Sequence, residues 1–188
     1  MRVFVGLGSN IHPRENLRRA VTLLEERSRL VAVSPVYRTA AVGRSDLPPF
    51  LNAAVELSDA RDPAELKYAL LRPIEAELGR VRTADRAAPR TIDLDLLLVD
   101  GLVLDDPGTG ITLPDPEILE RPHLALPLAD LAPDLVHPTD GRTLAEVAKA
   151  LSYEAEPECR PLAGWSATLA RPRGAGQPAA GARQEGDS

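Results

Sequence analysis

Short runs of alternating apolar and polar residues cover much of the chain, and they are separated by stretches with a longer apolar period. Alternation and β-branched residues predict strands. These strands are expected at residues 2–7, 31–37, 50–57 and 91–99, with shorter ones at 102–104 and 111–113.

Helices are predicted where apolar residues recur every three to four positions. Leu17, Ala20, Val21 and Leu24 give residues 13–30 one apolar face. A second helix is expected over 63–79, because Asp62-Pro63 is a start signal and Gly79 a stop signal. Pro73 should kink or interrupt it. Shorter helices are expected at 117–121, 125–131 and 143–151.

The order strand–helix–strand–strand–helix–strand–strand predicts an α+β fold. We expect a ferredoxin-like arrangement, a mainly antiparallel sheet covered by helices, rather than a doubly wound parallel sheet. One domain should span residues 1–170. The tail at 171–188 is rich in Gly, Ala, Pro and Arg and has no apolar periodicity, so we expect it to be disordered.

Composition narrows the function classes. The 188 residues hold a single cysteine, so no intramolecular disulfide and no cysteine-based zinc cluster can form. No apolar stretch is long enough to cross a membrane, and a cytoplasmic location is expected. The net charge of −6 argues against a nucleic-acid partner. A small anionic ligand would need only a local basic cluster.

The strongest candidate for chemistry is Asp93-Leu94-Asp95, at the start of an apolar strand. Side chains two apart on a strand point to the same face, so the two carboxylates should converge. Magnesium is commonly held by one or two carboxylates together with substrate phosphates. The alternative is that both carboxylates lie at an exposed strand end, or pair with Arg80 and Arg90.

A basic loop precedes the acidic pair and carries Arg80, Arg82, Arg86 and Arg90. Arginine suits multidentate recognition of phosphate, so the loop and the acidic pair together indicate a polyphosphate ligand. A solvated loop with local ion pairs remains the alternative for the loop alone.

Two further segments carry weaker signals. Gly6-Leu7-Gly8-Ser9-Asn10 is either a nucleotide-binding loop or a tight turn in which Asn10 is a local cap. Phe50 and Asn52 share a strand face, which is typical of a site for a flat heterocycle. The alternative places Phe50 in the core and Asn52 against a turn.

Together these segments resemble the 6-hydroxymethyl-7,8-dihydropterin pyrophosphokinases of folate biosynthesis. The resemblance covers about residues 2–150, and residues 89–95 (Pro-Arg-Thr-Ile-Asp-Leu-Asp) are its most specific part. The other matching stretches are Gly6–Asn10, Tyr37–Thr39, Phe50–Val55, Gly79–Arg82, Leu126–Pro133 and His137-Pro138.

The resemblance implies transfer of pyrophosphate from ATP to the pterin hydroxymethyl group, with release of AMP and with two Mg²⁺ ions held by Asp93 and Asp95. It implies catalytic roles for Arg80, Arg82, Arg90, Asp93 and Asp95. The implied ATP-binding residues are Glu75, Arg80, Arg90, Leu96, Thr112 and Arg121. The implied pterin-binding residues are Thr39, Val42, Phe50, Asn52 and His123. Small-molecule substrates are the expected ligands, and other folate-pathway enzymes are candidate partners.

The chain departs from the family pattern at three places. Ala87 stands where the family has Trp, Asp115 where it has His, and His123 where it often has Phe. A degenerate paralogue that binds pterin or nucleotide with little turnover is therefore the main alternative. An acidic interaction module is a second alternative.

Overall fold

The computed structural model describes residues 1–40, 48–82, 88–154 and 159–162. The helices and strands are, in chain order, β1 (Arg2–Ser9), α1 (Pro13–Arg27), β2 (Arg29–Val33), β3 (Tyr37–Thr39), β4 (Phe50–Ser58), α2 (Pro63–Glu65), the π-helical segment η1 (Leu66–Leu71), α3 (Arg72–Glu77), β5 (Asp93–Val99), β6 (Leu104–Asp106), β7 (Ile111–Leu113), the 3₁₀ turn η2 (Pro116–Leu119), α4 (Pro122–Leu131), α5 (Leu144–Glu154) and β8 (Arg160–Pro161). The predicted α+β class is confirmed.

The main sheet has the strand order β5-β1-β4-β3-β8, and β2 pairs with β4 beside β3. Every pairing in it is antiparallel. With β1 and β4 in the centre, the connection β1-α1-β2 and the connection β4-α3-β5 each return to the same sheet. This is the expected split βαβ arrangement. Strands β6 and β7 form a separate hairpin.

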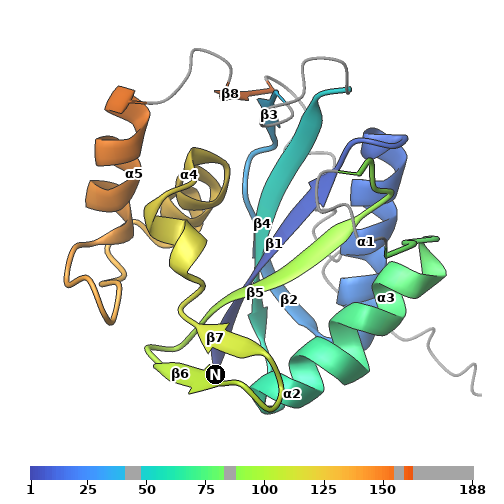
Figure 1. The fold of residues 1–188 in the computed structure, drawn as a ribbon, viewed down its shortest axis with the longest axis horizontal. Helices are drawn as coiled ribbons and strands as arrows, with labels where there is room; N and C mark the ends of the chain where they lie inside the picture. Colours follow the sequence, from blue (N-terminus) through green and yellow to red (C-terminus); the bar gives the residue numbers. More distant parts are fainter. Residues whose placement is uncertain (41–47, 83–87, 155–158, 163–188) are drawn as a thin grey trace, which may run out of the picture.

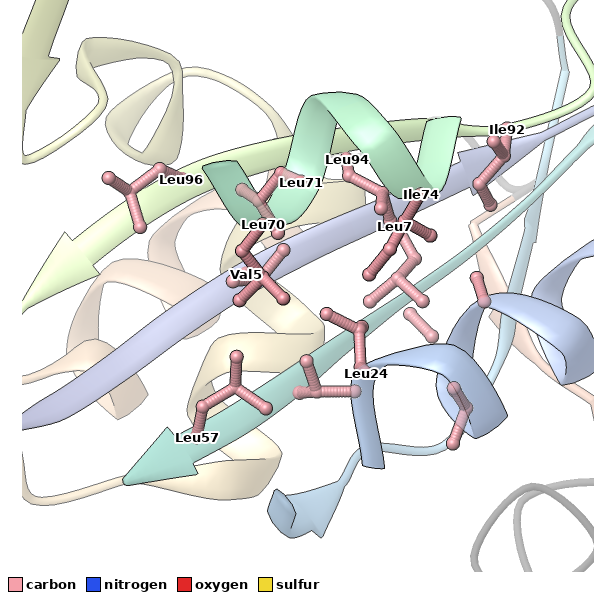
Figure 2. Packing of buried hydrophobic residues seen from close by; sticks show 14 of the residues in the cluster. Val5, Leu7, Leu24, Leu57, Leu70, Leu71, Ile74, Ile92, Leu94 and Leu96 are labelled. Atoms are coloured by element: carbon pink, nitrogen blue, oxygen red, sulfur yellow. The ribbon is translucent and has the colours of Figure 1, made fainter. Parts of the chain in front are cut away.

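Helices cover both faces of the sheet (Figure 1), with α1 and α3 on one side and α4 and α5 on the other. The core between the sheet and the α1/α3 layer is built from alternate residues of the strands, such as Val5, Leu7, Leu94 and Leu96. Figure 2 shows Leu94 and Leu96 of β5 beside Leu70, Leu71 and Ile74 of the helical segment above them. A second apolar cluster lies on the α4 side and includes Phe4, Ala54, Leu97 and Leu128.

Two helix predictions need correction in detail. The first helix ends at Arg27 instead of residue 30, because Arg29–Val33 already pairs with β4. The expected interruption at Pro73 takes the form of η1, in which the Arg72 N–H bonds to the Lys67 carbonyl five residues back. Proline lacks an N–H and its ring crowds the preceding turn, so a wider turn accommodates it.

Several strand predictions were also displaced. The single strand expected at 31–37 is divided into β2 and β3 by residues 34–36. Ser34 there is buried, and its N–H and Oγ both bond to Ala54 of β4. The strand expected at 102–104 lies at Leu104–Asp106, and β8 was not predicted. The expected domain boundary at residue 170 and the tail at 171–188 lie outside the described residues.

No helix in the described part of the chain is both long and apolar enough to cross a membrane.

Candidate active site

Asp93 and Asp95 lie on the α4 side of β5. Their neighbours Leu94 and Leu96 are buried in the opposite core, and successive strand residues point to opposite faces. Asp95 is paired with Gly6, where a Cβ would come within 3.1 Å of Leu97 and 3.5 Å of Leu124 of α4. The two carboxylates therefore share one face of the strand, as their spacing predicts.

Strand β1 lies between these carboxylates and β4. The β1 residues paired with Asp95 and Asp93 are both glycines, Gly6 and Gly8. Gly8 is paired with Asp93 on one side and with Asn52 on the other. A Cβ at Gly8 would lie 3.2 Å from Asn52 Oδ1. Neighbouring strands are about 4.8 Å apart, so Asp93 and Asn52 are separated by roughly 10 Å. Only Gly8, which has no side chain, lies between them. The expected loop or turn at Gly6–Asn10 is therefore wrong, because β1 runs to Ser9.

The β4 and β3 side of this face carries an amide and an aromatic ring. Asn52 is buried and its Nδ2 donates to Thr39 Oγ1 at 2.8 Å. Phe50 is paired with Thr39 and is half-buried. The guanidinium carbon of Arg90 lies 5.6 Å from the centroid of the Phe50 ring. Thr39, Phe50 and Asn52 are therefore brought together as expected, whereas Val42 lies outside the described residues.

Two arginines converge on Asp93. Arg90 donates from Nη1 to Asp93 Oδ2, and Arg80 Nη2 lies 3.6 Å from Asp93 Oδ1. Both guanidinium groups are largely buried, with 17% of the Arg90 side chain and 10% of the Arg80 side chain exposed. The pairing with Arg80 and Arg90, which was the alternative interpretation of the acidic pair, thus holds for Asp93. It also places two cations where an anion could be bound.

Asp95 is in a different electrostatic environment. Its side chain is exposed, yet the surrounding protein and the charges of Asp93, Asp115 and Glu117 raise its pKa to about 7, against the lowering effect of Arg90. Protein atoms packed around the carboxyl group limit its hydration, which is the largest cause of this rise, and repulsion by the neighbouring carboxylates adds to it. A cation that reached Asp95 from solvent would relieve that repulsion.

Glu75 of α3 is buried beneath this site. Its Oε1 accepts from the Leu94 N–H of β5 at 3.0 Å, and its Oε2 accepts from Arg82 at 2.6 Å. Burial, and secondarily the charge of Asp93, raise its pKa to about 7, while the Leu94 N–H and Arg72 act in the opposite direction. Glu75 therefore connects α3 to β5 and holds Arg82, whose side chain is 49% exposed.

The other expected nucleotide-binding residues are more scattered. Leu96 is buried in the core on the opposite face, so a contact with nucleotide could come only from its backbone. Thr112 of β7 is exposed and donates to Asp105. Arg121 lies 3.7 Å from Glu117 at the start of α4. His123, an expected pterin-binding residue two positions later in α4, has its pKa lowered to about 4 by burial and by the Arg121 charge, so its imidazole is neutral at pH 7.

Sequence reasoning missed the structural role of two residues. The sequence predicts only a local cap for Asn10, but its Oδ1 accepts from the Arg90 N–H at 2.7 Å. The sequence identifies Asp115 only as a departure from the family pattern. Its N–H donates to the Leu97 carbonyl at 2.8 Å, which places it beside β5, and its charge acts on Asp95. A polar residue directly after an apolar strand was the available signal for Asn10.

Among the described residues no group of three or more His, Cys, Asp or Glu side chains forms a metal cage. Asp93 and Asp95 supply two carboxylates, which suits a cation that takes its remaining ligands from substrate and water. The donor set therefore fits Mg²⁺ and does not resemble a structural zinc site.

Comparison with solved structures identifies the fold. The chain superposes on the HPPK-DHPS protein of Plasmodium falciparum, solved with pteroate, with a TM-score of 0.65 at 13% identity. That match covers 85% of this chain and 45% of the Plasmodium chain, so this chain spans about half the length of that protein. The ferredoxin-like prediction is confirmed.

Sequence comparison gives the family. A 2-amino-4-hydroxy-6-hydroxymethyldihydropteridine pyrophosphokinase of Pseudomonas aeruginosa is 44% identical over 156 residues, covering 81% of this chain and 93% of the relative. The Bacillus subtilis protein of the same name is 40% identical over 131 residues, covering 68% and 76%. Residues 4–133 match the family described as 7,8-dihydro-6-hydroxymethylpterin-pyrophosphokinase (HPPK). The chain therefore belongs to the HPPK family.

Proposed function

We propose that this chain transfers the pyrophosphoryl group of ATP to the hydroxymethyl oxygen of 6-hydroxymethyl-7,8-dihydropterin and releases AMP, a step of folate biosynthesis. One observation carries the proposal. An acidic pair with two arginines and an aromatic–amide pair share one sheet face, separated only by Gly8. A phosphate donor and a flat heterocyclic acceptor could therefore lie side by side.

Asp93 and Asp95 are the residues that would hold Mg²⁺, and the family resemblance implies two ions. Carboxylate oxygens are the ligands that Mg²⁺ prefers, and it commonly keeps substrate phosphates in its shell. When bound, the metal would supply charge neutralisation for the phosphates of ATP. The exposure of Asp95 supports access by a hydrated ion.

The protein's own contribution would be binding and positioning. Arg80 and Arg90 can hold phosphate oxygens through their guanidinium forks, because both already lie beside the acidic pair. Arg121 and Thr112 are proposed contacts of the nucleotide. Charge stabilisation and alignment are the main requirements of phosphoryl transfer, so no protein nucleophile is needed.

The pterin would lie over the β4 and β3 part of the face. The Phe50 ring offers stacking, and the Asn52 amide offers directional hydrogen bonds to a heterocycle edge. His123 is proposed as the second stacking group. Its neutral imidazole would not compete with Arg90 for anions.

The test is AMP formation from Mg-ATP, with and without 6-hydroxymethyl-7,8-dihydropterin. Pterin-dependent AMP supports the proposal. Binding of both ligands without AMP would instead identify a binding-only paralogue, the alternative that Asp115 and Ala87 suggested. If neither ligand binds in isothermal titration, the proposed substrates are wrong.

We further propose that the enzyme acts in the cytoplasm beside other enzymes of folate synthesis. The Schizosaccharomyces pombe relative is a folic acid synthesis protein, and this chain matches only 19% of its length. Such long relatives support an association between this domain and further enzymes. Co-elution of the chain with those enzymes from a native cell extract would test it.

A further inference from the structure

Asn10 is a buried residue between β1 and α1, and 4% of it is exposed. Its backbone and its side chain both bond to the backbone of Arg90. The Asn10 and Ile11 N–H groups donate to the Arg90 carbonyl at 3.1 and 3.2 Å, and the Arg90 N–H donates to Asn10 Oδ1 at 2.7 Å. Next along the chain, Ser9 Oγ donates to the Thr91 carbonyl at 2.5 Å. The backbone of Arg90 is thus fixed to the end of β1.

The Arg90 side chain joins the two halves of the proposed site. Its guanidinium pairs with Asp93 and lies over the Phe50 ring, 5.6 Å from the centroid. A shift of the Arg90 backbone would move the guanidinium relative to both groups at once. Its placement therefore depends on what holds residues 88–91.

Asn10 also has a weaker bond toward the β4 side. Its Nδ2 donates to the Pro48 carbonyl at 3.4 Å, two residues before Phe50. One side chain therefore contacts the segment that carries Arg90 and the segment that leads into Phe50. These segments are 38 and 80 residues from Asn10 in sequence.

A helix-capping role does not account for Asn10. The residue that caps α1 is His12, and its side chain makes no capping hydrogen bond. Asn16 and Ser9 stabilise this turn, because Asn16 Nδ2 and Ser9 Oγ donate to the Ile11 carbonyl at 2.7 and 3.2 Å. Asn16 thus provides a matched control, as it is also a buried asparagine of the same segment.

We propose that Asn10 is a positioning residue that sets Arg90 between the phosphates and the pterin ring. This inference rests on the proposed function, because it assigns Asn10 to the same reaction. Asn10 touches no substrate in this proposal and acts through Arg90.

The experiment compares Asn10→Ala, Asn16→Ala, Arg90→Ala and the double variant Asn10→Ala/Arg90→Ala in the full chain. Single-turnover AMP formation, pterin KM and Tm are measured for each. Displacing a catalytic group by about 1 Å costs up to roughly 100-fold in rate, so Asn10→Ala should lower the rate by about tenfold or more. Asn16→Ala should lower Tm by about as much as Asn10→Ala does, because each removes a buried hydrogen bond, but it should keep the rate within about twofold of the wild type.

The double variant separates positioning from ordinary stability. Where two residues act through one group, their effects are not additive. Asn10→Ala should therefore cost no more than about twofold further once Arg90 is alanine. An equal loss in both backgrounds, or a wild-type rate for Asn10→Ala, would overturn the assignment. Wild-type protein without pterin-dependent AMP would instead overturn the proposed function, and the role of Asn10 with it.

Discussion

The guanidinium of Arg90 lies over the ring of Phe50, with Cζ 5.6 Å from the ring centroid, while the same group is paired with Asp93. One side chain therefore contacts both the acidic pair on β5 and the aromatic side of β4. A planar cation can stack on a ring and bind an anion in its own plane at the same time. The role proposed for Arg90 therefore depends on the geometry of both contacts.

Replacement of Arg90 by lysine should lower kcat/KM for both substrates by about 10- to 100-fold, although the charge is kept. Lysine provides neither the planar stacking surface nor the bidentate fork. Steady-state AMP formation with each substrate varied in turn measures the effect. Arg142→Lys alters another arginine–aspartate pair, whose Nε–Oδ1 distance is 2.6 Å, and should leave both values unchanged. Equal kcat/KM values for Arg90→Lys and the wild type would show that Arg90 does not contribute to substrate binding or catalysis.

Asp95→Asn should abolish pterin-dependent AMP formation and leave the fold intact. The amide keeps the shape of the side chain but loses the charge that would bind Mg²⁺. Tm should not fall, because the change also removes repulsion from Asp93 and Asp115. The exposed residue Asp134 supplies the control Asp134→Asn, which should retain full activity. AMP release by Asp95→Asn at the wild-type rate would contradict the metal assignment.

The raised pKa of Asp95 predicts how metal-free stability depends on pH. Ionisation of a carboxyl group whose pKa is raised in the folded protein lowers the free energy of unfolding. The contribution of Asp95 to stability is therefore fully present below its unfolded pKa of about 3.9 and is lost as the pH rises through about 7. The wild-type Tm should therefore fall from pH 5 to pH 8 more than the Tm of Asp95→Asn. Glu75, whose pKa is also raised to about 7, acts in the same direction in both proteins.

Mg²⁺ should restore the stability that the protein loses between pH 5 and pH 8. Because it binds the ionised carboxylates, its stabilisation should be larger at pH 8 than at pH 5. Thermal unfolding with and without Mg²⁺ at the two pH values measures the difference. An identical Mg²⁺ effect at both pH values, in both the wild type and Asp95→Asn, would show that the metal binds elsewhere.

The two glycines of β1 provide a matched pair of variants. In Gly8→Ala the new Cβ would approach Asn52 Oδ1 at 3.2 Å, so the amide must move and the pterin KM should rise several-fold. In Gly6→Ala the Cβ would approach the fully buried Leu97 at 3.1 Å, which should cost about 1–3 kcal/mol of stability by overpacking. Chemical denaturation and pterin kinetics on both variants measure the contrast. A larger pterin effect in Gly6→Ala than in Gly8→Ala would contradict this division.

The sequence predicts those features of the site that depend on the alternation of side chains along one strand. The alternation in Asp93-Leu94-Asp95-Leu96 indicated a strand with two carboxylates on one face, and the structure has that arrangement. The pairing of Phe50 and Asn52 on one face followed from the same rule. Both conclusions need only neighbouring residues.

Contacts between distant segments could not be predicted in this way. Nothing near Asn10 indicates that its partner is Arg90, 80 residues away. Likewise, the bond of buried Glu75 to the Leu94 N–H depends on how α3 packs on β5. The break between β2 and β3 arises because Ser34 and Ala54 exchange hydrogen bonds, which is again a tertiary effect.

Two C-terminal truncations should have opposite consequences. Deletion of 172–188 should leave Tm within about 1 °C, since that composition offers little apolar surface to bury. Deletion of 155–188 also removes β8, which pairs with Tyr37 and Arg38 of β3, and Leu162, which packs on the core and donates to the Val36 carbonyl at 2.7 Å. Because β3 carries Thr39, the partner of Asn52, this deletion should lower Tm by several degrees and raise the pterin KM, with the ATP KM changed less. Equal behaviour of the two truncated proteins would show that β8 contributes nothing to the pterin side of the site.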